Sequence, residues 1–130
     1  MIQDSWAPDR RRTDRRVVPY RAEVNVAGLA APLRLRELGS GGMVIESASP
    51  LGLGDGIVFT LAATTDGAVI GPMHGHVAHS RLLLAKRLGD VPACLAGVAF
   101  DHVTAEQSAQ IARVLADIDQ RRRRRLQDAP

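Results

Sequence analysis

The sequence has few aromatic residues, one cysteine and no long apolar run. Aromatic residues make up 3% of the 130 positions, so a core must be built mainly from Val, Leu, Ile and Ala. Such aliphatic side chains, several of them β-branched, pack well on the pleated surface of a sheet. Cys94, the lone cysteine, cannot form an internal disulfide, and we expect it to be a small buried hydrophobe.

The lack of a long apolar run also indicates where in the cell the protein is expected. No segment approaches the roughly 20 apolar residues that a helix needs to cross a bilayer, and the N-terminus lacks the apolar stretch of a secretory signal. We therefore expect a cytoplasmic protein, in agreement with the single cysteine. Hydrophobic residues at 45% and charged residues at 24% are typical of a soluble chain that forms one core.

Positive charge is concentrated near the two ends, although the formal net charge is only +3. One group comprises 10–12, Arg15 and Arg16, and the other is the run Arg121 to Arg125. All basic residues except Lys86 are arginine, whose planar fork of donors matches phosphate and the guanine edge. The bias favours an anionic ligand. The second run also suits RNA, DNA or anionic lipid, but the few aromatics offer no platform for base stacking, so nucleic acid is not the expected partner.

The middle of the chain has the pattern of an antiparallel β-barrel. Alternating apolar and polar residues recur in six short segments, separated by Gly, Pro, Ser and Asp. The predicted strands span 17–26, 31–38, 43–46, 57–61, 68–85 and 95–100. The fifth is expected to bend at Gly71-Pro72 or at Gly75. Six strands with closely spaced turns favour a barrel over a parallel α/β sheet.

A helix is predicted after the last strand. Thr104 and Gln107 form a capping box, in which the two side chains satisfy free amides at the helix start. One apolar stripe with i, i+3, i+4, i+7 spacing then follows, and it should dock the helix onto the barrel. Its members are Ile111, Val114, Leu115 and Ile118.

These patterns divide the chain into three parts. Residues 1–16 are expected to form a flexible basic arm, since they show no hydrophobic periodicity. Residues 17–119 should form the barrel with its helix, and 120–130 an Arg-rich tail.

Three segments together resemble a PilZ domain. They are the arm RRRTDRRV, the glycine turn in RELGSGGMVIE, and the closing GVAFDHVTAEQSAQI before the helix, and in this order they cover about residues 10–118. The resemblance implies a six-stranded barrel of bacterial signalling that binds cyclic di-GMP. In that family the ligand is held by an arm motif RxxxR and a turn motif [D/N]xSxxG.

The arm motif fits in two registers. Either Arg11 pairs with Arg15, or Arg12 pairs with Arg16, and the sequence leaves both open. In either register arginine can bind phosphate and guanine acceptor atoms in a bidentate manner.

The turn motif departs from the family pattern. Glu37 stands in place of Asp or Asn and Gly39 in place of Ser, while Gly42 matches and Ser40 lies between them. A lost hydrogen bond and a displaced carboxylate together cost about 2.5–4 kcal/mol, or roughly 60–700-fold in affinity. The sequence therefore supports a cyclic di-GMP-binding regulatory module with a weakened turn. The alternative is a degenerate PilZ domain that binds no nucleotide and acts as a protein-interaction module, docking another signalling protein.

Neither a metal site nor an active site is expected. His74 and His76 share a strand face, but His79 should lie on the opposite face, which leaves too few ligands for zinc. Ser40 lies in a glycine turn that lacks the strand-to-helix context of a nucleophile elbow. We expect no enzyme activity and no cofactor; the oligomeric state is left open.

Overall fold

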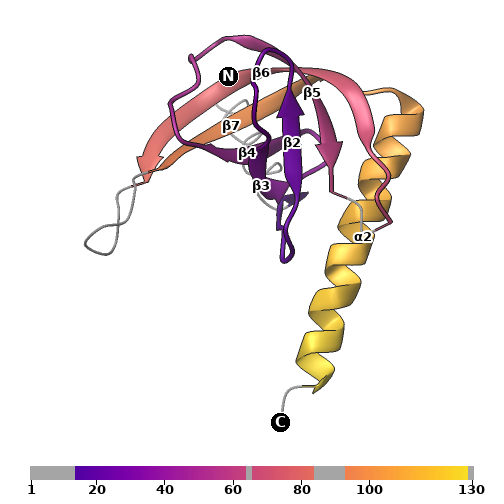
Figure 1. Ribbon diagram of the computed structural model, residues 1–130. Coiled ribbons are helices and arrows are strands. Elements are labelled where there is room, and N and C mark those ends of the chain that lie inside the picture. The colour runs from indigo at the N-terminus through magenta and orange to yellow at the C-terminus, as the bar shows by residue number, and fades with distance from the viewer. Residues whose placement is uncertain (1–13, 64–65, 84–92, 129–130) are drawn as a thin grey trace, which may run out of the picture.

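The computed structural model describes residues 14–63, 66–83 and 93–128. They form seven strands and one long helix (Figure 1). The elements are β1 (Arg16–Val17), β2 (Glu23–Val26), β3 (Leu33–Leu38), β4 (Gly42–Ser47), β5 (Gly56–Ala62), β6 (Ile70–Leu83), β7 (Ala93–His102) and α2 (Ala105–Asp128).

Six of the strands close into an antiparallel barrel. The sheet order is β1-β3-β2-β5-β6-β7-β4, and an additional pairing of β3 with β4 completes the ring. Every strand pairing is antiparallel. The predicted fold class is therefore confirmed, with the short β1 as an extra strand.

The first predicted strand, 17–26, is split in two. Pro19 lies in the gap between β1 and β2, where a proline has no N–H to donate to a ladder. The chain nevertheless stays beside β3, since Val18 N–H donates to the Arg36 carbonyl at 2.9 Å and Leu35 N–H to the Ala22 carbonyl at 2.9 Å. As a result, β1 and β2 share one edge of β3, and the arm enters the fold at the end of β3 that leads into the glycine turn.

Strand β6 is long and irregular. Its pairing with β5 shifts register opposite Gly71 and Pro72, and its pairing with β7 shifts between His74 and Gly75. These are the two places where a bend was predicted. Gly71 has φ +134° and lies tightly against β5, so the glycine suits this close approach.

The barrel is filled by aliphatic side chains, as the composition predicts. Phe59 is the only aromatic among the largest fully buried side chains of the described residues, and its ring lies 5.6 Å from that of Phe100. The others are Leu35, Leu38, Met43, Ile45, Leu61, Ile70, Met73, Ile111, Val24 and Val77. Cys94 is buried and unpaired, as expected of a small hydrophobe.

Helix α2 begins where the capping box predicts. Gln107 N–H donates to Thr104 Oγ1, and Thr104 N–H donates to Gln107 Oε1, both at 3.1 Å. Gln107 also donates to the Pro72 carbonyl at 3.2 Å, which fixes the helix start to β6. The apolar stripe from Ile111 to Ile118 is buried against the barrel.

The helix is longer than its apolar stripe. It continues past Ile118 to Asp128, and its last turns project beyond the barrel (Figure 1). The described part of the predicted tail is thus helical, because arginine is a good helix former and suits the negative end of the helix dipole. Among the described residues, no helix is both long and apolar enough to cross a bilayer.

Candidate functional site

The arm and the glycine turn meet at one end of the barrel. Pairing of β1 with β3 places Arg16 opposite Leu38 and Val17 opposite Glu37. The β3–β4 hairpin closes just beyond, where Gly39 N–H donates to the Gly42 carbonyl at 2.9 Å. Two segments 26 residues apart in sequence are thereby in contact.

Asp14 connects the arm directly to the turn. Its Oδ2 accepts a hydrogen bond from Ser40 N–H at 2.7 Å and another from the Ser40 hydroxyl. The pKa of Asp14 is held below its ordinary value, mainly by the hydrogen bond from the Ser40 side chain and next by the one from the Ser40 amide. The carboxylate therefore occupies two donors of the turn that a ligand could otherwise use.

The two substituted motif positions lie beside Arg15. Glu37 Oε1 is 3.9 Å from Arg15 Nη1, a long ion pair. Gly39 is buried under the arm, and a Cβ added there would lie 3.5 Å from Arg15 Cα and 3.6 Å from Asp14 Oδ2. These are ordinary contacts, so a Cβ at position 39 does not displace the arm.

Gly42 matches the family pattern, and a contact within the barrel explains why glycine is needed at this position without any ligand. A Cβ added at Gly42 would lie 2.6 Å from the Val98 carbonyl oxygen of β7. The close approach of β4 and β7 therefore requires glycine here. The match at this position supports the fold and says nothing about nucleotide binding.

A basic pocket of about 420 Å³ separates the arm from the second half of α2. The arm contributes Arg15 and Arg16, and the helix contributes Arg121, Arg122 and Arg125. The remaining lining residues are Val17, Pro19, Ile118 and Asp119.

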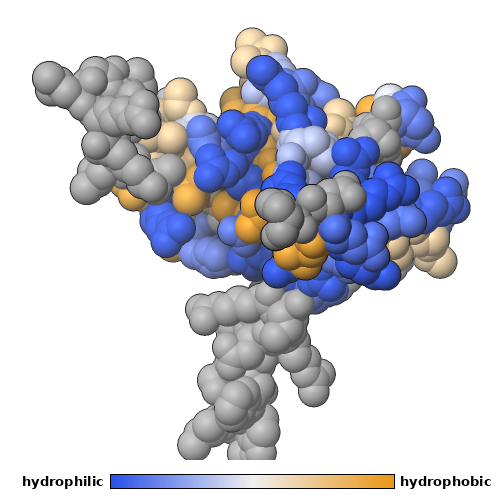
Figure 2. Space-filling view, turned by 90° about the horizontal axis from the view of Figure 1, so that it is seen from below, coloured by the Kyte–Doolittle hydropathy of each residue, from blue (hydrophilic) through white to orange (hydrophobic). Residues whose placement is uncertain are grey.

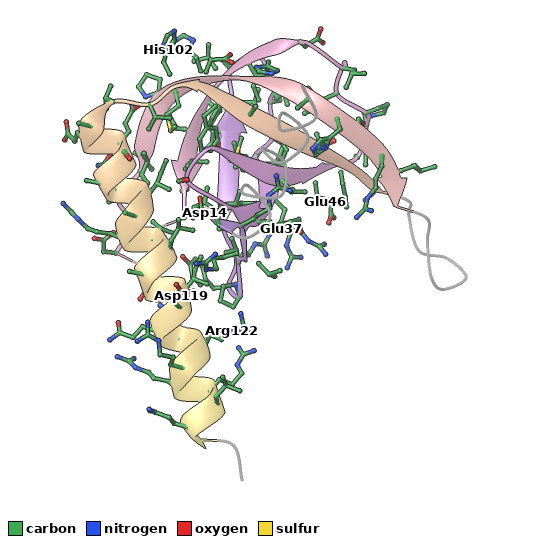
Figure 3. The ribbon with its side chains drawn as sticks, turned by 180° about the vertical axis from the view of Figure 1, so that it is seen from behind. Asp14, Glu37, Glu46, His102, Asp119 and Arg122 are labelled. Atoms are coloured by element: carbon green, nitrogen blue, oxygen red, sulfur yellow. The ribbon has the colours of Figure 1, made fainter. Side chains whose placement is uncertain are left out.

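Asp119 joins the two walls of this pocket. Its Oδ1 accepts from Arg16 Nε at 2.8 Å, and both side chains are about one-third exposed. Figure 3 shows Asp14 and Glu37 at the end of the barrel nearest this part of the helix, with Asp119 and Arg122 on α2 and His102 at the far end. Viewed from below, the described surface on this side is largely hydrophilic (Figure 2).

A second contact holds the helix against the chain that follows the arm. Arg121 lies over the Tyr20 ring at 4.9 Å from its centroid and pairs with Asp117 at 2.9 Å. The Tyr20 hydroxyl donates to the Ala63 carbonyl at 2.7 Å. Burial, followed by the charge of Asp117, raises the pKa of Tyr20 above its ordinary value.

The structure gathers most of the predicted site residues in one place. Those brought together are Arg15, Arg16, Glu37, Gly39, Ser40 and Gly42. Arg11 and Arg12, the partners in the two arm registers, lie outside the described residues.

Sequence reasoning missed the acidic residues of the site and the role of the helix. Asp14 and Asp119 carry no motif signal, since only the fold brings them to Ser40 and Arg16. The sequence pattern predicts the run Arg121 to Arg125 as a tail separate from the barrel. Continuing the helical spacing past Ile118 would have placed part of it on the face that points to the barrel.

One expectation about the histidines was wrong. A register shift between Val77 and His79 inserts Ala78 into the ladder as a bulge. The shift turns the His79 ring onto the outer side of Gly97, so His79 faces outward as His74 and His76 do. Within 14–63, 66–83 and 93–128, no group of three His, Cys, Asp or Glu could hold a metal ion.

The chain is similar to known proteins in structure but not in sequence. No family model matches it, and no curated protein matches it in sequence. In structure it is similar to the PilZ domain, with cyclic di-GMP, of YcgR from Escherichia coli, at a TM-score of 0.68 and 17% identity over 88% of this chain and 95% of that one.

A second structural match covers a larger protein. The crystal structure of YcgR from Escherichia coli in complex with cyclic di-GMP gives a TM-score of 0.68 and 17% identity over 87% of this chain. Here the matched part is 47% of the other chain. The strand order of the barrel, the capped helix and the structural neighbours all indicate the same fold. The chain therefore has the PilZ fold.

Proposed function

We propose that this chain is a regulatory module that binds cyclic di-GMP at the arm end of its barrel. The observation that carries the proposal is the meeting of the arm with the β3–β4 turn, with Arg15 3.9 Å from Glu37 and Asp14 bonded to Ser40. The two structural neighbours described above hold the same nucleotide, which supports the proposal.

The chemistry of the ligand suits the arm. Cyclic di-GMP carries two phosphates, and its guanines present O6 and N7 acceptors that arginine binds in a bidentate manner. Arg15 and Arg16 are both partly buried, where a charge interaction is stronger than in bulk water. In the proposed complex they clamp phosphates and guanine edges, together with Arg11 or Arg12. The carboxylate of Glu37 accepts from guanine N–H groups.

The turn contributes less than the arm. Gly39 has no hydroxyl, and the Ser40 donors are already bound by Asp14. A nucleotide that uses those donors must first displace a carboxylate. Binding should therefore be weak and should depend on salt, because much of the attraction is between charges.

The second candidate is an interaction module that binds no nucleotide. The observation that favours it is that this end of the barrel is complete without a ligand. Asp14 satisfies the Ser40 donors, and Gly42 is explained by its contact with β7. In this reading the PilZ fold is kept as a surface for another signalling protein.

Calorimetric titration with cyclic di-GMP at low and high salt separates the two candidates. The parent should bind weakly at low salt and more weakly at high salt. Arg15→Ala should abolish binding if the register is Arg11 with Arg15, and Arg16→Ala if it is Arg12 with Arg16. Arg81→Ala is the control: it removes the same charge from an exposed site on β6, and it should change nothing. Absence of saturable binding by the parent at low salt would reject the sensor in favour of the interaction module.

A further inference from the structure

The face of α2 that points to the barrel changes from apolar to basic. Ile118 ends the buried apolar stripe. Residues three, four and seven positions further on are Arg121, Arg122 and Arg125, which lie on the same face of a helix. The pattern that docks the first half of the helix is thus continued by arginine where the helix leaves the barrel.

These three arginines line the pocket against the arm. Arg123 and Arg124, in the same run, do not line it. The run therefore has two faces, one toward Arg15 and Arg16 and one toward solvent. This division provides a control in which the same charge can be removed from either face.

The pocket carries an excess of positive charge. Five arginines line it, and Asp119 is its only acidic lining residue among the described part of the chain. Three of the five have an acidic partner: Arg16 is bound to Asp119, Arg121 is bound to Asp117 outside the pocket, and Arg15 lies 3.9 Å from Glu37. For Arg122 and Arg125, no acidic partner is found among the described residues. Like charges on facing walls repel, and an anion between them would remove that repulsion.

We propose that this pocket is a phosphate site and that it holds the phosphodiester groups of the nucleotide between the arm and α2. The inference rests on the proposed function. Arginine forks on two facing walls match the oxygens of a phosphodiester. The volume of about 420 Å³ lies within the roughly 300–1,000 Å³ typical of small-molecule sites. Arg122 and Arg125 then supply donors that the altered turn, with Gly39 in place of serine, does not.

The first test compares two double variants in cyclic di-GMP titrations at one salt concentration. Arg122→Ala with Arg125→Ala should weaken binding by about tenfold or more, because charge-assisted hydrogen bonds are lost. Arg123→Ala with Arg124→Ala removes the same charge from the same helix and should stay within about twofold of the parent. Alanine keeps the helix, which circular dichroism checks in both variants.

Equal losses in the two variants would overturn the pocket and indicate diffuse attraction to the basic helix end. No loss in either variant would also overturn the pocket, while leaving the proposed function intact if the parent binds.

The second test uses inorganic pyrophosphate and does not depend on the nucleotide. Side-chain Nε–H signals of Arg122 and Arg125 should shift saturably in ¹⁵N NMR spectra, and the shift of Arg15 should disappear in the Arg122→Ala, Arg125→Ala variant. Absence of saturable shifts would overturn the phosphate site whatever cyclic di-GMP does. Shifts with pyrophosphate and none with cyclic di-GMP would reject the proposed function and the nucleotide as the occupant, and would retain the phosphate site.

Discussion

The two sides of the candidate site differ in what they offer a ligand. On the arm and helix side, five arginines surround an open pocket. On the turn side, the donors of Ser40 are bound by Asp14, Gly39 has no side chain, and Gly42 serves the contact with β7. The arm and helix side is rich in positive charge, and the turn side has few free hydrogen-bonding groups with which to recognise a base.

This difference indicates how affinity and selectivity would be divided in the proposed complex. Charge attracts any dianion of suitable size, whereas hydrogen bonds to base edges distinguish one nucleotide from another. A module built in this way would bind through phosphate and discriminate weakly between guanine and other bases. Changes to each side should therefore have separable effects.

The largest expected effect is on the free energy of unfolding, through the packing of α2 against the barrel. Ile118 is buried and lies next to the pocket, so Ile118→Ala should lower the free energy of unfolding by about 2–5 kcal/mol. Arg122→Ala, one turn further on and exposed, should change it by less than about 0.5 kcal/mol. Denaturant titration measures both. Similar values for the two variants would mean that the apolar and basic parts of the stripe are not distinct.

The next effect is on the turn side. Restoring the family residues with Glu37→Asp and Gly39→Ser together should strengthen cyclic di-GMP binding by about 2.5–4 kcal/mol, the cost of the altered hydrogen bonds. The Cβ of a serine at position 39 makes only ordinary contacts. Calorimetry at one fixed salt concentration compares the double variant with the parent. If the repair brings no gain, positions 37 and 39 do not contact the ligand.

A smaller effect is expected on removing the end of the helix. Deleting residues 121–130 should lower the melting temperature only slightly, because exposed charges add little stability. The structure adds one contact to this prediction: Arg121 lies over Tyr20, and such a cation–π pair is worth about 0.5–1 kcal/mol. A decrease of a few degrees is therefore expected in thermal melts, and Arg121→Ala alone should reproduce it. A decrease of many degrees would show that the helix end packs in some further way.

The smallest effect is a pH dependence of the contact between arm and turn. The pKa of Asp14 is lowered in the folded chain by its bonds from Ser40, so this contact stabilises the fold above the unfolded pKa of Asp14. The stabilisation is lost as the pH falls through the lower, folded pKa. Carboxyl NMR of Asp14 should show a titration midpoint below the ordinary value for aspartate, and Ser40→Ala should raise it. An unchanged midpoint in Ser40→Ala would show that the contact is absent in solution.

The sequence predicts the fold well because the fold depends on local patterns. Alternation and turn residues locate the barrel strands, and the capping box at Thr104 locates the start of α2. The bulge at Ala78 reversed the expected side of His79, since an inserted residue breaks the alternation and leaves no signature in composition.

The candidate site was only partly predictable. Motif positions such as Glu37 and Gly39 can be located along the chain, but the contacts of Asp14 with Ser40 and of Asp119 with Arg16 join residues far apart in sequence. The stripe that becomes basic after Ile118 was visible in the sequence. Its function could not be inferred from the sequence, because only the fold shows that the arm lies opposite it.

Backbone ¹⁵N NMR during a titration with cyclic di-GMP tests the central claim most directly. We predict saturable shifts in the arm up to Val17, in the turn from Glu37 to Gly42 and in 119–125, with His102 at the far end of the barrel unchanged. Absence of saturable shifts, or shifts centred on the end that carries His102, would contradict the claim that this end of the PilZ fold binds the nucleotide.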